Sequence, residues 1–117
     1  MELEKGMYVR LNCNYELGIG KTIGEIDEDN FIKTKFKDDF ECSLPTYMIT
    51  KASHNIIDLI EDDDLIKFKI YGELFICKVY NKSLINYDGE VFDLEELDIV
   101  SILTKEQYES MSYKVGE

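Results

Sequence analysis

The stretch ELGIGKTI at Glu16–Ile23 returns, with changes, as ELFICKVY at Glu73–Tyr80. An ungapped alignment of residues 7–23 with residues 64–80 contains four identities in 17 positions, all of them inside these two stretches. Two copies are fewer than the three or more units that a stacked repeat array needs for stability. The repeat therefore predicts a small domain that occurs twice.

Both copies have the pattern of β-strands. DLIKFKIYG at residues 64–72 alternates apolar side chains with lysines, which is the period of two expected of a half-buried strand. In the first copy, DEDN at residues 27–30 predicts a turn and FIKTKF at residues 31–36 predicts the next strand. Turn signals recur every ~8 to 12 residues, a spacing typical of small all-β domains.

Each copy also ends alike, with a short polar segment before a last apolar strand. We expect the polar segment to form one helical turn. Strand, bent strand, hairpin, helical turn and strand in about 50 residues is the outline of an SH3-like barrel. Gly18 and Gly20 would let the bent strand pass close to its neighbour. The sequence therefore predicts an all-β protein of two tandem SH3-like barrels.

The expected boundaries are a first barrel at residues 1–52, a junction at 53–63 and a second barrel at 64–117. The junction is too apolar for a flexible linker and is expected to be a short strand or helix that ties the barrels together. In TKEQYESM, Thr104 and Gln107 fit a capping box, so a short C-terminal helix should close the second barrel.

The composition excludes several classes of protein. The net charge of −12 argues against a surface that binds nucleic acid directly, because such binding depends on Lys and Arg displacing counterions. No signal-peptide pattern is present, and no apolar run approaches the ~18 residues of a membrane span. Three cysteines without CxxC spacing predict neither a disulfide framework nor a zinc site. We expect a reduced, cytoplasmic protein that does not bind membranes.

No catalytic, cofactor or metal motif stands out. The only histidine, His54, has no visible partner for general acid–base catalysis. GIGKT at residues 18–22 lacks the first glycine of a phosphate-binding loop, because that position is Tyr15. EIDEDN and EDDD lack the ligand spacing of a calcium loop. The sequence therefore predicts a protein that is not an enzyme and needs no cofactor or metal.

Acidity is the strongest feature of the composition. Residues 1–57 contain 7 basic and 10 acidic side chains (net −3), and residues 58–117 contain 6 and 15 (net −9). The acidic side chains of the second half form two runs, which we expect to converge on one face and to steer basic partners. Solubility alone is the simpler explanation of the acidity. The predicted contact residues are Asp62, Asp63, Asp64, Asp93, Glu95 and Glu96.

The junction SHNIIDLIE at residues 53–61 and the ending that begins with TKEQ at residues 104–107 resemble segments of small proteins encoded by phages and prophages of low-GC Gram-positive bacteria. The resemblance implies a phage setting inside a bacterial host. In that setting, a non-catalytic acidic protein would be an inhibitor of a host nucleic-acid enzyme, such as a CRISPR effector or another defence nuclease. Its carboxylates would occupy the place of phosphates through charge-assisted hydrogen bonds with a basic protein surface.

Two other functions fit the sequence. A phage structural or adaptor protein would bind a protein partner through exposed aromatic side chains, with little dependence on salt. The candidate aromatic residues are Tyr8, Tyr15, Tyr47, Tyr71 and Tyr80. A protein that sequesters a nucleotide or another small molecule would use a pocket between the barrels and would gain thermal stability from its ligand.

Overall fold

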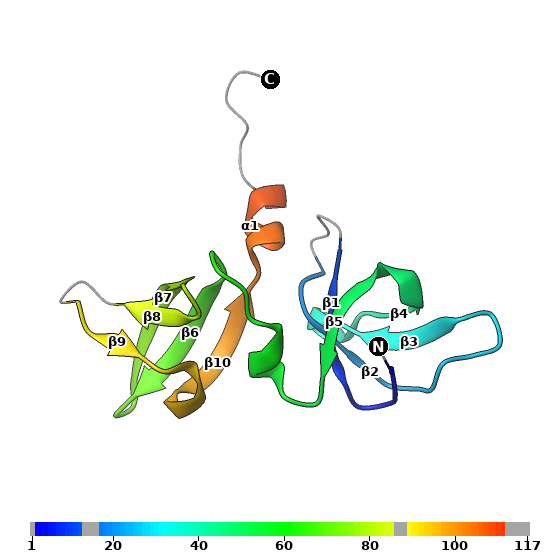
Figure 1. Ribbon diagram of the computed structural model, residues 1–117, viewed down its shortest axis with the longest axis horizontal. Coiled ribbons are helices and arrows are strands. Elements are labelled where there is room, and N and C mark those ends of the chain that lie inside the picture. Colours follow the sequence, from blue (N-terminus) through cyan, green and yellow to red (C-terminus); the bar gives the residue numbers. More distant parts are fainter. Residues whose placement is uncertain (1, 13–16, 86–88, 112–117) are drawn as a thin grey trace, which may run out of the picture. The chain divides into compact units, whose positions relative to one another are not determined.

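The computed structural model describes residues 2–12, 17–85 and 89–111, which form mostly β structure with one short α-helix (Figure 1). The chain divides into two compact units. The first holds the residues up to Leu59 together with those from Glu106 onward, and the second runs from Ile60 to Lys105. The all-β prediction is confirmed. The division lies inside the predicted junction, and the residues from Glu106 group with the first unit, although the sequence predicted a helix on the second.

The first unit is a five-stranded antiparallel sheet with the strand order β4-β3-β2-β1-β5. Four strands follow one another as a meander, and the fifth returns to pair with the first. Its strands are β1 (Tyr8–Leu11), β2 (Gly20–Thr22), β3 (Phe31–Lys35), β4 (Glu41–Pro45) and β5 (Ile49–Ser53). Three 3-10 turns accompany them, namely η1 (Lys37–Asp39), η2 (Thr46–Met48) and η3 (Ile56–Leu59).

The second unit is also a five-stranded antiparallel sheet, with the order β10-β6-β7-β8-β9. It has the same meander, again with the fifth strand paired to the first. Its strands are β6 (Leu65–Ile70), β7 (Glu73–Tyr80), β8 (Ser83–Ile85), β9 (Val91–Phe92) and β10 (Asp98–Leu103). The 3-10 turn η4 (Leu94–Glu96) precedes β10, as η2 precedes β5, and the helix α1 (Lys105–Met111) follows it.

The two sheets share their pairing register. Val9 on β1 pairs with Gly20 on β2, and Ile66 on β6 pairs with Cys77 on β7. In the alignment of the sequence repeat, Ile66 is the counterpart of Val9, and Cys77 is the counterpart of Gly20. The resemblance between ELGIGKTI and ELFICKVY therefore marks equivalent paired strands in two copies of one fold.

The structural repeat extends beyond the aligned stretch. Thr34 on β3 pairs with Cys42 on β4, and Leu84 on β8 pairs with Phe92 on β9. The distance in sequence from β2 to β3 is greater than that from β7 to β8, so the second copy has a shorter connection between its second and third strands. This shorter connection explains why the sequence alignment ends after the second strand.

The fifth strands carry the same irregularity. The register of β5 against β1 shifts at Thr50, and that of β10 against β6 shifts at Val100. A β-bulge bends its strand and increases the local twist. Both copies therefore bend their last strand at the same point.

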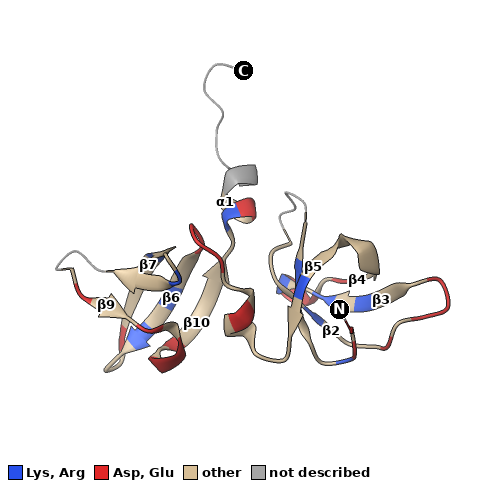
Figure 2. Ribbon diagram, in the orientation of Figure 1, with Lys and Arg blue, Asp and Glu red and all other residues tan. Residues whose placement is uncertain are grey.

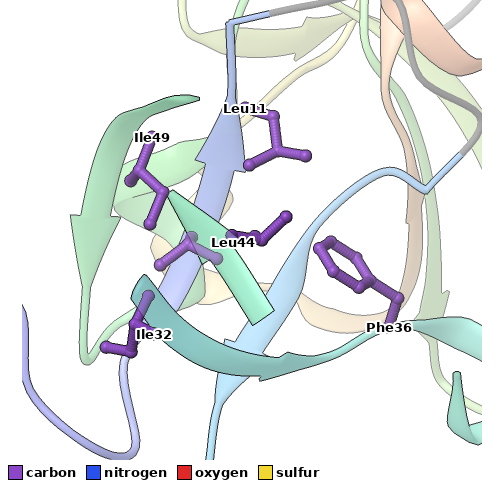
Figure 3. Close-up of a cluster of buried hydrophobic side chains, with 6 residues drawn as sticks. Leu11, Ile32, Phe36, Leu44 and Ile49 are labelled. Atoms are coloured by element: carbon purple, nitrogen blue, oxygen red, sulfur yellow. The ribbon is translucent and has the colours of Figure 1, made fainter. Parts of the chain in front are cut away.

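The cores lie on one face of each sheet. In β3, Ile32 and Thr34 are buried and alternate with exposed side chains, which is the period of a half-buried strand. In the second unit, the ring of Phe68 stacks on that of Phe75, with centroids 5.8 Å apart. Figure 3 shows the buried apolar cluster of the first unit, which consists of Val9, Leu11, Ile32, Phe36, Leu44 and Ile49. The buried apolar residues of the second unit are Ile60, Ile66, Phe68, Val79, Leu84 and Leu94.

The predicted turn before β3 is present. The Asp27 carboxylate oxygen Oδ1 accepts hydrogen bonds from the backbone amides of Asp29 (2.9 Å) and Phe31 (3.0 Å). Asp at the start of a turn forms such local bonds readily, because its short side chain reaches the amides that follow it. The DEDN segment therefore sets where β3 begins.

Gly20 confirms the predicted close approach of the bent strand. A Cβ atom at this position would lie 2.6 Å from Cε1 of Phe36 and 2.8 Å from Cγ2 of Thr34. Both neighbours belong to stiff side chains in the core of the first unit. Glycine, which has no Cβ, is therefore the only residue that fits here without moving Phe36 or Thr34.

Replacement of Gly20 by Ala should destabilise the first unit by about 1–3 kcal/mol, because the core must move to admit one methyl group. Urea unfolding followed by circular dichroism measures the change. Gly24→Ala is the matched control: its Cβ would lie 3.8 Å from Cβ of Lys33, an ordinary contact. Equal stability of the two variants would contradict this account of Gly20.

Arg10 lies on the face of β1 opposite to the core, yet it is only 2% exposed. Its Nη1 donates to the carbonyl oxygen of Leu59 (2.9 Å), and its Nη2 donates to Oε2 of Glu106 (2.8 Å). Leu59 ends η3, and Glu106 lies in the first turn of α1. These two helical segments therefore cover the outer face of β1.

Glu106→Gln should lower the free energy of unfolding of the first unit by about 1.5–3 kcal/mol, because hydrogen bonds to charged groups are worth that much and the buried guanidinium would lose one charged acceptor. Glu41→Gln serves as the control, since its 3.7 Å pair with Lys33 is exposed on both sides. Such surface pairs contribute about 0–1 kcal/mol. A loss no larger than that of Glu41→Gln would show that Arg10 is stabilised by other groups.

Candidate functional site

The predicted contact residues Asp62 and Asp63 are exposed in the turn before β6. Oδ1 of Asp62 accepts a hydrogen bond from the backbone amide of Lys82 (3.0 Å), and Oδ1 of Asp63 lies 3.9 Å from Nζ of Lys78. Both carboxylates therefore have neighbours in the second unit but remain accessible to a partner.

Asp64 differs from the prediction, because it is fully buried. Its Oδ2 accepts the backbone amide of Glu61 (2.8 Å), and its Oδ1 accepts that of Lys105 (2.9 Å), the first residue of α1. A carboxylate in this position satisfies amides that the turn and the helix start leave without a helical partner. Asp64 is thus a structural residue and does not belong to an exposed contact surface.

The second acidic group surrounds η4. Asp93 is exposed, and its Oδ1 accepts the backbone amide of Glu95 (3.0 Å), which caps the 3-10 turn. Glu95 and Glu96 are exposed, and Asp98 follows at the start of β10. These residues form one small acidic surface, the η4 surface, defined as Asp93, Glu95 and Glu96.

The structure does not bring the two acidic groups together. β10 runs antiparallel to β6, with Asp98 opposite Lys69 and Leu103 opposite Leu65. The turn that holds Asp62 therefore lies at one end of this strand pair and η4 at the other, as Figure 2 shows. At ~3.3 Å per residue, the six-residue strands separate the two groups by roughly 17 Å.

Asp64→Asn should destabilise the second unit by about 2 kcal/mol. The amide group of Asn would turn an N–H toward one of the two backbone donors, and a buried donor without an acceptor is costly. Urea unfolding measures the loss, with Asp62→Asn as an exposed control from the same acidic run. If Asp64→Asn proves as stable as Asp62→Asn, the two hydrogen bonds that the Asp64 carboxylate accepts from backbone amides are not needed for folding.

Ser53, His54 and Asp58 contain the residue types of a hydrolase triad but do not form one. Nε2 of His54 pairs with Oε1 of Glu4 (2.5 Å), and the Ser53 hydroxyl donates to Oδ2 of Asp58 (2.5 Å). The hydrogen bond with Glu4 raises the pKa of His54 above its ordinary value, against a smaller opposing effect of desolvation. His54 therefore makes a surface contact with Glu4 and has no contact with the Ser53 hydroxyl that would activate it.

The two described cysteines, Cys42 and Cys77, show no sign of activation. Burial raises the pKa of both the Cys42 and the Cys77 thiol, and reactive cysteines have a lowered pKa. Cys42 packs against the core of the first unit. Cys13 lies outside the described residues. In the part of the chain that is described, no group of three His, Cys, Asp or Glu side chains could hold a metal ion.

The outer face of the second sheet carries a surface that the sequence did not lead us to predict. The register pairs Lys67 with Ile76 and Lys69 with Leu74 across β6 and β7, on the face opposite to buried Ile66. Tyr80 continues this face toward β8, because its neighbour Val79 points into the core. We call this surface the β7 face and define it as Lys67, Lys69, Leu74, Ile76, Lys78 and Tyr80.

Apolar side chains of the β7 face stand in solvent. The exposed fraction is 52% for Leu74, 65% for Ile76 and 69% for Tyr80. Lys67 is half-buried and Lys69 is exposed. Among the described residues, no carboxylate lies within salt-bridge distance of Lys67 or Lys69. In a protein of net charge −12, this face is both apolar and locally basic.

Sequence reasoning missed the β7 face although a signal was present. The alternation in β6 correctly placed its two lysines opposite to the apolar residues. In ELFICKVY, however, Leu74, Phe75 and Ile76 are consecutive apolar residues. In a strand, consecutive residues point to opposite faces. At least one of these apolar side chains therefore had to lie on the same face of the sheet as the lysines.

The tyrosines proposed for an adaptor divide between the units. In the first unit, Nζ of Lys21 lies 5.2 Å from the ring centre of Tyr8, which is half-buried, and Tyr47 is 80% exposed. In the second unit, Tyr71 and Tyr80 are exposed. Tyr15 lies outside the described residues.

Comparison with known proteins found no matching protein-family model, curated protein or solved structure. None of the helices in the described ranges is long and apolar enough to cross a membrane.

Proposed function

We propose that this protein is a non-catalytic protein-binding module built from two SH3-like domains. Each unit has a four-strand meander, a 3-10 turn and a fifth strand that pairs with the first. That order supports an SH3-like assignment for both units. The phage setting implied by the sequence resemblance would make the partner a phage or host protein.

The β7 face is the observation that carries this proposal. An exposed apolar patch rimmed by polar groups usually marks an interaction site, because leaving it in water has no structural benefit. Leu74 and Ile76 are aliphatic, and burying such a side chain gains roughly 1.5–3 kcal/mol. Binding through this face is close to the adaptor hypothesis, in which exposed aromatic side chains such as Tyr80 bind a protein partner with little dependence on salt.

The η4 surface supports a second candidate function. Its three carboxylates are exposed within four consecutive residues, and Asp98 adds a further charge two positions on. In this function the protein inhibits a host nucleic-acid enzyme, and the η4 surface meets Arg and Lys of the enzyme in place of phosphates. Asp62 and Asp63 lie at the other end of the strands and would contact a different part of the partner.

Replacement of both Leu74 and Ile76 by Ser should weaken partner binding at least tenfold, because the lost burial exceeds the ~1.4 kcal/mol that corresponds to that factor. The full chain would be immobilised, partners from a low-GC Gram-positive host identified by mass spectrometry, and the dissociation constant of each purified partner measured for both chains.

Two variants make this test decisive. Tyr47→Ser removes an exposed aromatic side chain from the first unit and should leave binding unchanged. A variant with Asp93→Asn, Glu95→Gln and Glu96→Gln removes the charge of the η4 surface. A partner that tolerates the loss of Leu74 and Ile76 but not the loss of these charges would replace the β7-face proposal with acidic mimicry.

A further inference from the structure

The internal repeat identifies the position in the second unit that corresponds to Arg10. Lys67 follows Ile66 as Arg10 follows Val9, and Val9 and Ile66 occupy equivalent positions in the pairing of the two sheets. The partners on the fifth strands agree as well: Arg10 pairs with Lys51 beside the bulge of β5, and Lys67 pairs with Ser101 beside the bulge of β10. Both cations point away from the core of their sheet.

The first unit shows what covers such a cation. The Arg10 guanidinium donates to the Leu59 carbonyl and to the Glu106 carboxylate. Both acceptors belong to short helical segments, η3 and α1. One helical segment thus brings a carboxylate to the cation, and Arg10 becomes buried on the outer face of β1.

In the part of the second unit that the structure describes, no helical segment brings a carboxylate to the equivalent cation. Lys67 is only half-buried, and Ile76 directly opposite is 65% exposed. Ile19 of the first unit, which aligns with Ile76, is half-buried, whereas Ile76 is exposed. Leu17, which aligns with Leu74, packs against the core of its unit instead. The same fold is therefore closed on this face in one copy and open in the other.

We propose that the β7 face binds a short acidic helical segment of a partner protein. A carboxylate of that segment meets Lys67, as Glu106 meets Arg10, and its apolar side chains cover Leu74 and Ile76. The inference rests on the proposed protein-binding function and names the chemistry of the partner.

A helix fits this surface better than a strand does. A partner strand would add to β9 or β10, which form the edges of the second sheet, because unpaired backbone groups lie there. The β7 face belongs to β6 and β7, two strands that are already paired on both sides. An amphipathic helix presents side chains without needing backbone partners.

The charge of the face selects the sign of the partner. Lys67, Lys69 and Lys78 surround the aliphatic side chains, so a basic helix would place like charges against them. Asp98 lies opposite Lys69 on β10, but among the described residues it forms no ion pair with that lysine. Close opposite charges give specificity, and like charges suppress the wrong partners. The carboxylate of Asp63 lies 3.9 Å from the Lys78 ammonium, and both side chains are exposed.

The test is a selection from a displayed library of helical peptides that share an apolar stripe and have randomised polar positions. The full chain should select peptides enriched in Asp and Glu. A chain with Lys67→Glu and Lys69→Glu should select peptides enriched in Lys and Arg. A chain with Lys33→Glu and Lys35→Glu, on the exposed side of β3, is the matched control and should select as the unchanged chain does.

The best acidic peptide would then be titrated into the 15N-labelled chain. Its amide shifts should centre on β6 and β7, and Lys67→Glu should weaken its binding at least fivefold. Library selection that shows no acidic enrichment, returns no binder, or is unaffected by the reversal at Lys67 and Lys69 would overturn the inference. In that case, partner binding that still depends on Leu74 and Ile76 would leave the proposed function standing, so the two failures can be distinguished.

Discussion

The ion pair of Arg10 with Glu106 organises the first unit. A guanidinium does not lose its proton in a protein, so a buried Arg must be given acceptors. Leu59 and Glu106 supply two of them, and they belong to segments that follow β5 and β10 in the chain. The sheet of the first unit is therefore covered on its outer side around β1, and residues from Glu106 onward group with a unit that is distant in sequence.

Divergence at this one position separates the two copies. Lys in place of Arg can keep its ammonium in water while its methylene groups lie on the sheet, so it does not require a buried carboxylate. A second difference lies at a neighbouring position, which in the second unit faces the core, where Phe75 stacks on Phe68. Gly18 leaves the space that the Gln107 carboxamide occupies, whereas Phe75 in the aligned position is a bulky ring that is 41% exposed. The first copy is built to be closed by its own chain, and the second is not.

The sequence predicted what depends on local pattern. Strand alternation, the Asp27 turn and the close approach at Gly20 each follow from residues within a few positions of one another. The role of Asp64 could not be predicted in this way, because Lys105, whose backbone amide donates to its side chain, is 41 residues away. Four consecutive acidic residues give no signal of which carboxylate turns inward. The separation of the two acidic groups depends on the register of β6 with β10, which only the folded sheet reveals.

A protein of net charge −12 can bind an acidic partner because charge–charge interactions act over a limited range. At physiological salt the screening length is about 8 Å, so the summed charge of the protein repels a distant anion only weakly. Within contact distance, the lysines of the β7 face dominate, and the aliphatic side chains between them exclude water and strengthen the pairing. Added salt screens both the long-range repulsion and the local attraction. The first effect raises the affinity for an acidic partner and the second lowers it. A basic partner of the η4 surface would be attracted at both ranges, and its affinity would fall steadily with salt. Net charge alone therefore does not identify the partner, because the sign of the local surface decides what can bind.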